Sequence, residues 1–488
     1  MKLKIQVALL LFVGMLAAVS SCRHEVPTPA ATDHGFPDEV GKIFINRCAT
    51  AGCHNAASHQ NSGGLLLDSW EHLFEGGNNG AVIVPFSVDY SPLLYFINTD
   101  SALGPVAVPT MPLNSTPLSK EEYLIIRNWV ASGATDREGN VPFASSPQTR
   151  QKIYAVHRGC DMVAVIDAEK NLVMRYIAVG EFAYPEAPTY IQVSPDGRYA
   201  WVGFWYNRKI YRIDTNTDEV VGSPDLGENF WYVLHFTPDG EKILVTNGDN
   251  NNLISVNPLT QEVQQLTTGT EFSTPFGIAS NATSDTFYVT GAFGNTVYKY
   301  ATGYNKKISI DGKPLTSMSA PGTPDPYQII MSPDYSKYFI SCANTNEVRV
   351  MDAKTDSLLK VIPVGIQPAN FAISKVKPYL FVSCVEDNVS LPGMRGSVYV
   401  LDYNNLTVVK KLEGKLFQPN GITVNDKDNT LYIFSRNQNF DGPAPHHQGP
   451  CTGRNGFYSV YDLNTLAPVT GRRYEVLVDP IVSDVRFK

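Results

Sequence analysis

The sequence predicts a multidomain protein in which a small all-α domain is followed by a larger all-β domain built from repeated units. Residues 37–135 contain two segments with the periodicity of amphipathic helices. Residues 151–488 repeat a pattern of short strands and tight turns about every 43 to 60 residues. The 37 Gly and 33 Pro, together with only 18% charged residues, agree with a chain that is rich in turns.

The composition excludes several classes of protein. The 488 residues are 43% hydrophobic and 11% aromatic, so the chain is not intrinsically disordered. The net charge is −8 and the Lys and Arg residues are not clustered, which excludes nucleic acid as a partner. The 7 Cys are too few for a dense disulfide scaffold in a chain of this length.

The first residues have the features of an export signal. Lys2 and Lys4 precede an apolar run that is short for a membrane span, an order typical of a secretory signal peptide. The run ends in Val-Ser-Ser-Cys at residues 19–22, which resembles the lipobox of bacterial lipoproteins. The resemblance implies that residues 1–21 are a lipoprotein signal peptide. An ordinary signal peptide and a membrane anchor are the alternatives.

The lipobox resemblance also implies that Cys22 is the first mature residue and carries the lipid. Residues 22–36 contain Pro27 and Pro29 and are expected to form a tether between the lipid and the folded protein. The expected location is the bacterial cell envelope, with the protein anchored to a membrane by its lipid and facing the periplasm or the cell surface.

Two cysteines and a histidine form the most informative motif of the chain: Cys48, Cys53 and His54. In c-type cytochromes two thiols form thioethers with the haem vinyl groups, and the histidine that follows binds the iron. The usual spacing between the cysteines is two residues. The spacing of four found here resembles a known variant of the attachment motif. A Cys48–Cys53 disulfide is one alternative, and a zinc site is another, although no second Cys/His pair follows at a suitable spacing.

The surroundings of this motif predict a small helical domain. Residues 39–47 form an amphipathic helix that leads into the motif, and Ser119 and Glu122 form a capping box that opens a second helix ending near Ser132. The domain resembles the cytochrome c domains of planctomycete and Bacteroidetes envelope proteins over residues 37–135, and this implies one covalent haem c. The resemblance depends on an ordered series of short segments at residues 63–68, 82–85, 91–95 and 111–112.

Met111 is the expected sixth ligand of the haem iron. It lies in a Pro-rich loop, residues 106–117, just before the last helix, and a thioether ligand raises the haem potential relative to a second histidine. His59 follows the attachment motif too closely to cross the haem. His72 lies in a short predicted helix and remains an alternative, as does an open site.

The remainder of the chain carries the repeats. Each unit has a tight turn such as Ser194-Pro195-Asp196-Gly197 and a strand that ends in Asp or Asn, a pattern that suits four-stranded blades. The first unit lacks an inner strand, and residues 480–487 form an inner strand with nothing after it. The C-terminal strand is therefore expected to complete the first blade and to close the ring. Seven predicted inner strands begin at Pro188, Trp231, Pro275, Pro326, Pro368, Pro419 and Pro480.

These units resemble YVTN-type β-propeller repeats, so the expected fold is a cytochrome c domain, a linker at residues 136–150 and a seven-bladed β-propeller. An eight-bladed ring is the alternative. Ring closure would make the first and last blades neighbours, which predicts a disulfide between Cys160 and Cys451 in an exported protein. Cys342 and Cys384 are the competing pair and are expected to be free thiols.

Three functions from different classes remain open. The first is an exported, lipid-anchored c-type cytochrome for electron transfer, whose propeller docks a redox partner protein or binds a ligand. The second is a haem-dependent oxidoreductase with its substrate site on the propeller face, and the third is a surface binding protein with structural haem. His446 and His447 lie in a long loop of the last blade and are expected to be solvated.

Overall fold

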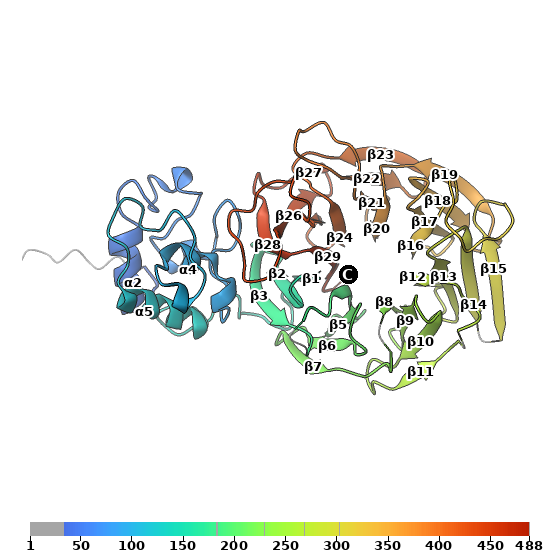
Figure 1. Cartoon of the computed structure of the whole chain (residues 1–488), viewed down its shortest axis with the longest axis horizontal. Helices are drawn as coiled ribbons and strands as arrows, with labels where there is room; N and C mark the ends of the chain where they lie inside the picture. Colours follow the sequence, from blue (N-terminus) through green and yellow to red (C-terminus); the bar gives the residue numbers. More distant parts are fainter. Residues whose placement is uncertain (1–33, 182–183, 229, 268, 302, 488) are drawn as a thin grey trace, which may run out of the picture.

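The computed structural model describes residues 34–181, 184–228, 230–267, 269–301 and 303–487. A helical part and a ring of β-sheets lie side by side, with the helical part at one edge of the ring (Figure 1). The predicted signal peptide, Cys22 and most of the predicted tether lie outside the described residues. Within the described part of the chain, no helix is long and apolar enough to cross a membrane.

Short helices and long loops make up the helical part. Its first helix, α2, continues directly into a π-helical turn, η1, which ends at Cys48. The bounds are α2 Asp38–Ile43, η1 Phe44–Cys48, η2 His59–Asn61, α3 Trp70–Leu73, η3 Val88–Tyr90, α4 Pro92–Ile97, η4 Ser101–Leu103 and α5 Lys120–Ala131.

An aromatic cluster packs α2 and η1 against α5. The ring of Phe36 stacks on that of Phe44 with centroids 4.9 Å apart, and Trp129 of α5 meets both rings edge-on at 6.1 and 6.0 Å. The predicted capping box is confirmed, because Ser119 accepts the Glu122 N–H while the Glu122 carboxylate accepts the Ser119 N–H at 2.8 Å. Capping satisfies two N–H groups that the first turn of a helix would otherwise leave unpaired.

The described β-strands form seven sheets arranged as the blades of a propeller (Figure 1). Blade 1 contains β29 Pro480–Val485, β1 Lys152–His157, β2 Met162–Asp167 and β3 Leu172–Ala178; blade 2 contains β4 Pro188–Val193, β5 Tyr199–Phe204, β6 Tyr211–Asp214 and β7 Glu219–Gly222; blade 3 contains β8 Trp231–Phe236, β9 Ile243–Asn247, β10 Asn252–Val256 and β11 Val263–Gln265.

The other four blades follow in chain order. Blade 4 contains β12 Pro275–Ser280, β13 Thr286–Gly291, β14 Thr296–Ala301 and β15 Tyr304–Ser309; blade 5 contains β16 Pro326–Met331, β17 Lys337–Cys342, β18 Glu347–Asp352 and β19 Leu358–Pro363; blade 6 contains β20 Pro368–Ile373, β21 Tyr379–Cys384, β22 Ser397–Asp402 and β23 Thr407–Leu412; blade 7 contains β24 Pro419–Asn425, β25 Thr430–Ser435, β26 Asn455–Asp462, β27 Ala467–Pro468 and β28 Tyr474–Val478.

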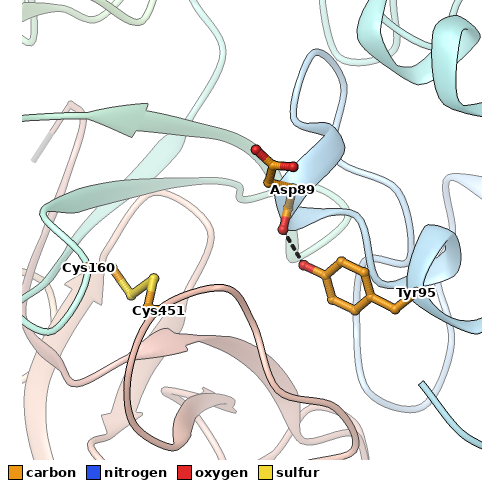
Figure 2. The surroundings of a disulfide bond; sticks show 4 residues. All are labelled: Asp89, Tyr95, Cys160 and Cys451. Carbon is orange, nitrogen blue, oxygen red and sulfur yellow. Dashed lines mark hydrogen bonds between the residues drawn. A yellow bond between two sulfur atoms is a disulfide. The ribbon is translucent and has the colours of Figure 1, made fainter. Parts of the chain in front are cut away.

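The C-terminal strand closes the ring, as the sequence predicts. Strand β29 pairs antiparallel with β1, with Ile153 opposite Val485 and Val156 opposite Val482. This pairing gives blade 1 its inner strand, and a closed ring leaves only short inner edges that are protected in the channel. The structure also joins the Sγ atoms of Cys160 and Cys451 in a disulfide across the closure, with the Cα atoms 5.5 Å apart (Figure 2).

The segment predicted as a linker packs against both parts of the protein. Phe143 contacts the buried cluster of the helical part and also two buried clusters of the propeller. Its ring meets Phe74 edge-on with centroids 5.9 Å apart. Further contacts join the two parts, including a hydrogen bond from the Arg175 guanidinium to the Pro85 carbonyl at 3.2 Å. The helical part is therefore fixed against the outer edge of blades 1 and 7.

Candidate functional site

The cysteine–histidine motif folds into a compact turn at the end of η1. The N–H of His54 donates to the Cys48 carbonyl at 3.1 Å, and the N–H of Cys53 donates to the Thr50 carbonyl at 3.1 Å. Gly52 adopts a φ of +82°, a conformation that a residue with a Cβ rarely tolerates. The four residues between the cysteines are thus taken up in the turn, which keeps Cys48 beside His54.

The imidazole of His54 is oriented by one hydrogen bond. Its Nδ1 lies 3.0 Å from the Leu65 carbonyl oxygen. A carbonyl can only accept, so Nδ1 carries the proton and Nε2 presents a lone pair, which has no hydrogen-bond partner among the described residues. Burial lowers the pKa of His54, although the Leu65 carbonyl acts in the opposite direction. The ring is held in the neutral form that binds metals.

Both cysteines of the motif are free thiols in the described structure, not a disulfide. Cys48 packs against the buried cluster that includes Phe44 and Trp129. Burial is the largest effect on the Cys48 thiol and raises its pKa to about 12, against the opposing charge of Arg47. The sulfur is therefore protonated at neutral pH. The described residues contain no group of three or more His, Cys, Asp or Glu that could hold a metal ion.

Met111 packs against the same buried cluster as Cys48, although the two residues are far apart in the sequence. Its N–H donates to the carbonyl of Phe96 in α4 at 2.7 Å, which fixes the Met111 loop to that helix. No hydrogen bond between described residues joins Met111 directly to His54. The loop presents an apolar surface to solvent, since Val108 is 83% exposed and Leu113 is 52% exposed.

Arg47 connects the attachment motif with the Met111 loop. Its Nη1 donates to the Glu122 carboxylate at 2.7 Å, and its Nη2 donates to the carbonyl oxygens of Thr116 at 2.7 Å and Pro117 at 3.3 Å. Glu122 is the same carboxylate that caps α5. One guanidinium therefore joins the residue before Cys48 to the end of the Met111 loop and to the start of the last helix. The sequence carried no signal for this contact, because the partners are about 70 positions apart.

The two rival histidines have other partners. The Nδ1 of His72 lies 2.6 Å from the Asp68 carboxylate, and the His72 side chain is 44% exposed. The Nδ1 of His59 lies 3.3 Å from the Asn55 carbonyl and 3.2 Å from that of Ala56. The donor set of Cys48, Cys53 and His54, with a free imidazole lone pair, fits a covalently attached haem.

A group of aromatic and histidine contacts that the sequence did not predict joins the last blade to the helical part. His446 stacks on Phe96 with ring centroids 5.1 Å apart, and His447 meets Tyr95 at 5.5 Å. The Nδ1 of His447 lies 2.9 Å from the Glu475 carboxylate, and the side chains of these two residues are only 10% and 3% exposed. The expectation that the histidine pair is solvated is therefore wrong for His447, because the loop folds back over α4.

Comparison with known proteins identifies the helical part. Residues 51–105 match the family model described as Planctomycete cytochrome C. The match includes Cys53 and His54 and ends before Met111, while Cys48 lies just ahead of it. The chain is a fusion of a cytochrome c domain of this type with a seven-bladed β-propeller. No curated protein sequence matches the chain significantly.

Two of the solved structures that match the chain each cover roughly two thirds of it. A functionally unknown protein from Desulfotomaculum acetoxidans DSM 771 is 14% identical, with a TM-score of 0.48, and the match covers 67% of this chain and 99% of that one. Kuenenia stuttgartiensis hydrazine synthase is 16% identical, with a TM-score of 0.45, and the match covers 62% of this chain and 90% of that one. Neither likeness extends to function at this level of identity.

Proposed function

We propose that this protein is an exported c-type cytochrome that transfers electrons in the bacterial cell envelope. One haem is attached covalently through Cys48 and Cys53, with His54 and Met111 as the axial ligands of its iron. Cys22 carries the lipid that anchors the protein to a membrane. The propeller is the platform that docks a redox partner protein or a ligand.

The observation that carries this proposal is the hydrogen bond from His54 Nδ1 to the Leu65 carbonyl, 3.0 Å long. It leaves Nε2 unprotonated and free, directly after the second cysteine, as a proximal haem ligand requires. When bound, the haem supplies the one-electron chemistry, and the chain supplies its ligands and its apolar surroundings.

The Met111 loop supports electron exchange with a protein partner. The exposed apolar side chains of Val106, Val108 and Leu113 lie on the loop that carries Met111 and give this loop an apolar surface. Such patches on soluble proteins are typical of interaction sites. A partner that docks there excludes water from the neighbourhood of the iron ligand and shortens the path for an electron.

A second candidate function is a haem-dependent oxidoreductase with a substrate site on the propeller. One observation favours it: the loop of residues 437–456 contacts α4 through His446 and also lines a cavity on the propeller face through Arg454. The same loop therefore reaches from the cytochrome domain to a space that a small molecule could enter.

Haem attachment is tested by expressing the full chain, with its signal, in a host that matures c-type cytochromes. A haem stain on a denaturing gel and a pyridine haemochrome spectrum should report one haem per chain. The double variant Cys48→Ala, Cys53→Ala should lose the stain, and His72→Ala should keep it as a matched control. Exported protein that never stains for haem would contradict the proposal. Bound haem that cannot be reduced and reoxidised would favour a structural role instead.

The membrane anchor is tested separately by the variant Cys22→Ala. We expect this change to move the protein from the membrane fraction to the soluble fraction, because the lipid is its only proposed link to the membrane. Ser21→Ala is the control, since a small residue remains before the cysteine. If the Cys22→Ala protein stays in the membrane with an intact N-terminal segment, the lipid anchor is wrong.

A further inference from the structure

The propeller contains a cavity of about 320 Å³ where the ring closes. Its walls come from the loop after β1, the segments before β4 and β29, and the loop between β25 and β26, so blades 1, 2 and 7 all contribute. The volume is at the lower end of the range of small-molecule sites. The disulfide between Cys160 and Cys451 lies in two of these loops and ties them together.

A buried charge cluster forms one side of the cavity. Asp479 is 1% exposed and accepts hydrogen bonds from Arg158 Nε at 2.7 Å and from Arg436 Nε at 2.6 Å. Two guanidinium groups thus share one carboxylate, which leaves one positive charge without a counter-charge. Among the described residues that line the cavity, Asp479 alone is acidic, and Arg454 adds a further guanidinium.

The Arg158 guanidinium has hydrogen-bond donors that are free to bind a ligand. Within the part of the chain that the structure describes, its side chain makes a hydrogen bond only through Nε, to Asp479. Its two Nη groups therefore remain available, and this end of a guanidinium is the pair of donors that grips a carboxylate with two parallel hydrogen bonds. Asp479 holds the guanidinium in place from the opposite side, so little rotamer freedom is lost on binding.

Apart from the polar side chains of Gln438 and Thr452, the remaining walls are aromatic and apolar. The guanidinium of Arg158 lies over the ring of Trp205, 5.9 Å from its centroid, and the neighbouring Tyr206 is 49% exposed. Ala187 and Val478 line the cavity with apolar side chains. These walls offer a flat surface for a ring and little for a strongly hydrated inorganic ion.

The geometry points to a binding site for a small organic carboxylate with a compact aromatic or apolar body. The carboxylate lies on Arg158, with Arg454 nearby, and the body lies against Tyr206. The binding itself is independent of haem, whereas its use as a substrate or effector of the cytochrome rests on the proposed function. The loop of residues 437–456 connects the cavity with the cytochrome domain, because it lines the cavity at Thr452 and places His446 on α4.

The test is calorimetric titration of the purified mature protein with benzoate, and with benzamide as the neutral compound of the same shape. Benzoate should bind and benzamide should not. Arg158→Gln should weaken benzoate binding at least tenfold, roughly the effect of losing a charge-assisted pair of hydrogen bonds. The matched control is Arg198→Gln, an exposed arginine in the turn between β4 and β5 on the other face of the ring, which should leave binding unchanged.

A second variant keeps the proposal testable if Arg158→Gln does not fold. Tyr206→Ala removes an exposed wall of the cavity, leaves Asp479 paired, and should weaken benzoate binding several-fold. No benzoate binding at millimolar concentration, binding that both variants leave unchanged, or inorganic phosphate that competes as well as benzoate would each overturn the proposal. The Cys48→Ala, Cys53→Ala protein should still bind benzoate, so a failure of haem attachment is distinguishable from a failure of this site.

Discussion

The imidazole of His446 stacks on the phenyl ring of Phe96, with ring centroids 5.1 Å apart. The carbonyl of the same Phe96 accepts the N–H of Met111, so the last blade of the propeller is one residue away from the proposed iron ligand. Tyr95 and His447 form a second ring contact beside it, with the ring planes tilted by 55°. The propeller therefore supports the cytochrome domain at the helix from which the Met111 loop is held.

The variant Met111→Ala tests the sixth ligand. Loss of the thioether should lower the haem potential by on the order of 0.1 V, part of the ~0.8 V range that axial ligands span. The charge-transfer band of methionine-bound ferric haem should disappear from the spectrum. The matched control is Met318→Ala, because Met318 is 73% exposed on the propeller. An unchanged potential and spectrum in the Met111→Ala protein would exclude Met111 as the ligand.

The variant Phe143→Ala tests the contact between the two domains. Phe143 packs against buried clusters of both, so its truncation should lower the free energy of unfolding by about 2–3 kcal/mol, less than for a fully buried Phe. It should also expose residues 136–150 to limited proteolysis. Phe293→Ala is the control, because Phe293 is 49% exposed and should change stability by less than about 0.5 kcal/mol. Equal stability of the two variants would show that the segment is a passive linker.

The sequence predicted the elements of this protein better than the contacts between its parts. The blades follow from a repeating pattern of strands and turns, and ring closure follows from one unpaired strand at each end of the repeats. Phe143 lies before the repeats and His446 lies in a long loop within the last one, and both segments are rich in Pro and polar residues and resemble ordinary loops. Such contacts depend on how two finished domains meet, which local periodicity does not encode.

The same reasoning applies to the candidate site. Cys48, Cys53 and His54 were recognisable because covalent attachment demands those residue types in that order. The carbonyl of Leu65, which orients His54, carries no side-chain signal at all. Arg158 and Asp479 are 321 positions apart and meet only because the ring closes. Sequence therefore indicates the reactive groups, while folding decides what orients them.

Peptide mapping without reduction tests the cysteine pairing. We expect a peptide that joins Cys160 to Cys451, and reduction of this bond should cost on the order of 2–4 kcal/mol of stability. Cys342 and Cys384 should react with an alkylating reagent only after unfolding, because burial raises the pKa of both thiols and keeps the reagent out. A Cys342–Cys384 cross-link, or free thiols at both Cys160 and Cys451, would contradict the arrangement of the blades.

The aspartates that end the third strand of many blades act as turn caps, and this predicts an acid-sensitive propeller. The carboxylate of Asp462 accepts the N–H groups of Thr465 at 2.7 Å and Asn464 at 3.0 Å. The N–H of Thr465 is the largest cause that lowers the pKa of Asp462, and Asp352 has the same arrangement with Thr355. In blade 3 an asparagine occupies the equivalent position and accepts the same bonds.

The direction in which stability changes with pH follows from these lowered pKa values. A carboxyl whose pKa is lower in the folded protein than its unfolded value of about 3.9 adds stability above that pH, and this stability is lost as the pH falls through the folded pKa. The same holds for Asp334. Its hydrogen bonds, above all the one with Ser332, lower its pKa to about 2. The melting temperature should therefore fall as the pH decreases from about 5 to 2.

The double variant Asp352→Asn, Asp462→Asn tests this explanation. An amide oxygen accepts the same N–H groups but does not titrate, so the variant should be slightly less stable than the wild type at pH 7 and should lose less stability on acidification. The control is Glu169→Gln, an exposed carboxyl in the turn after β2, which should leave the pH profile of the melting temperature unchanged. If the Asp352→Asn, Asp462→Asn protein and the wild type lose stability in parallel between pH 5 and 2, these carboxylates are not the acid-sensitive groups.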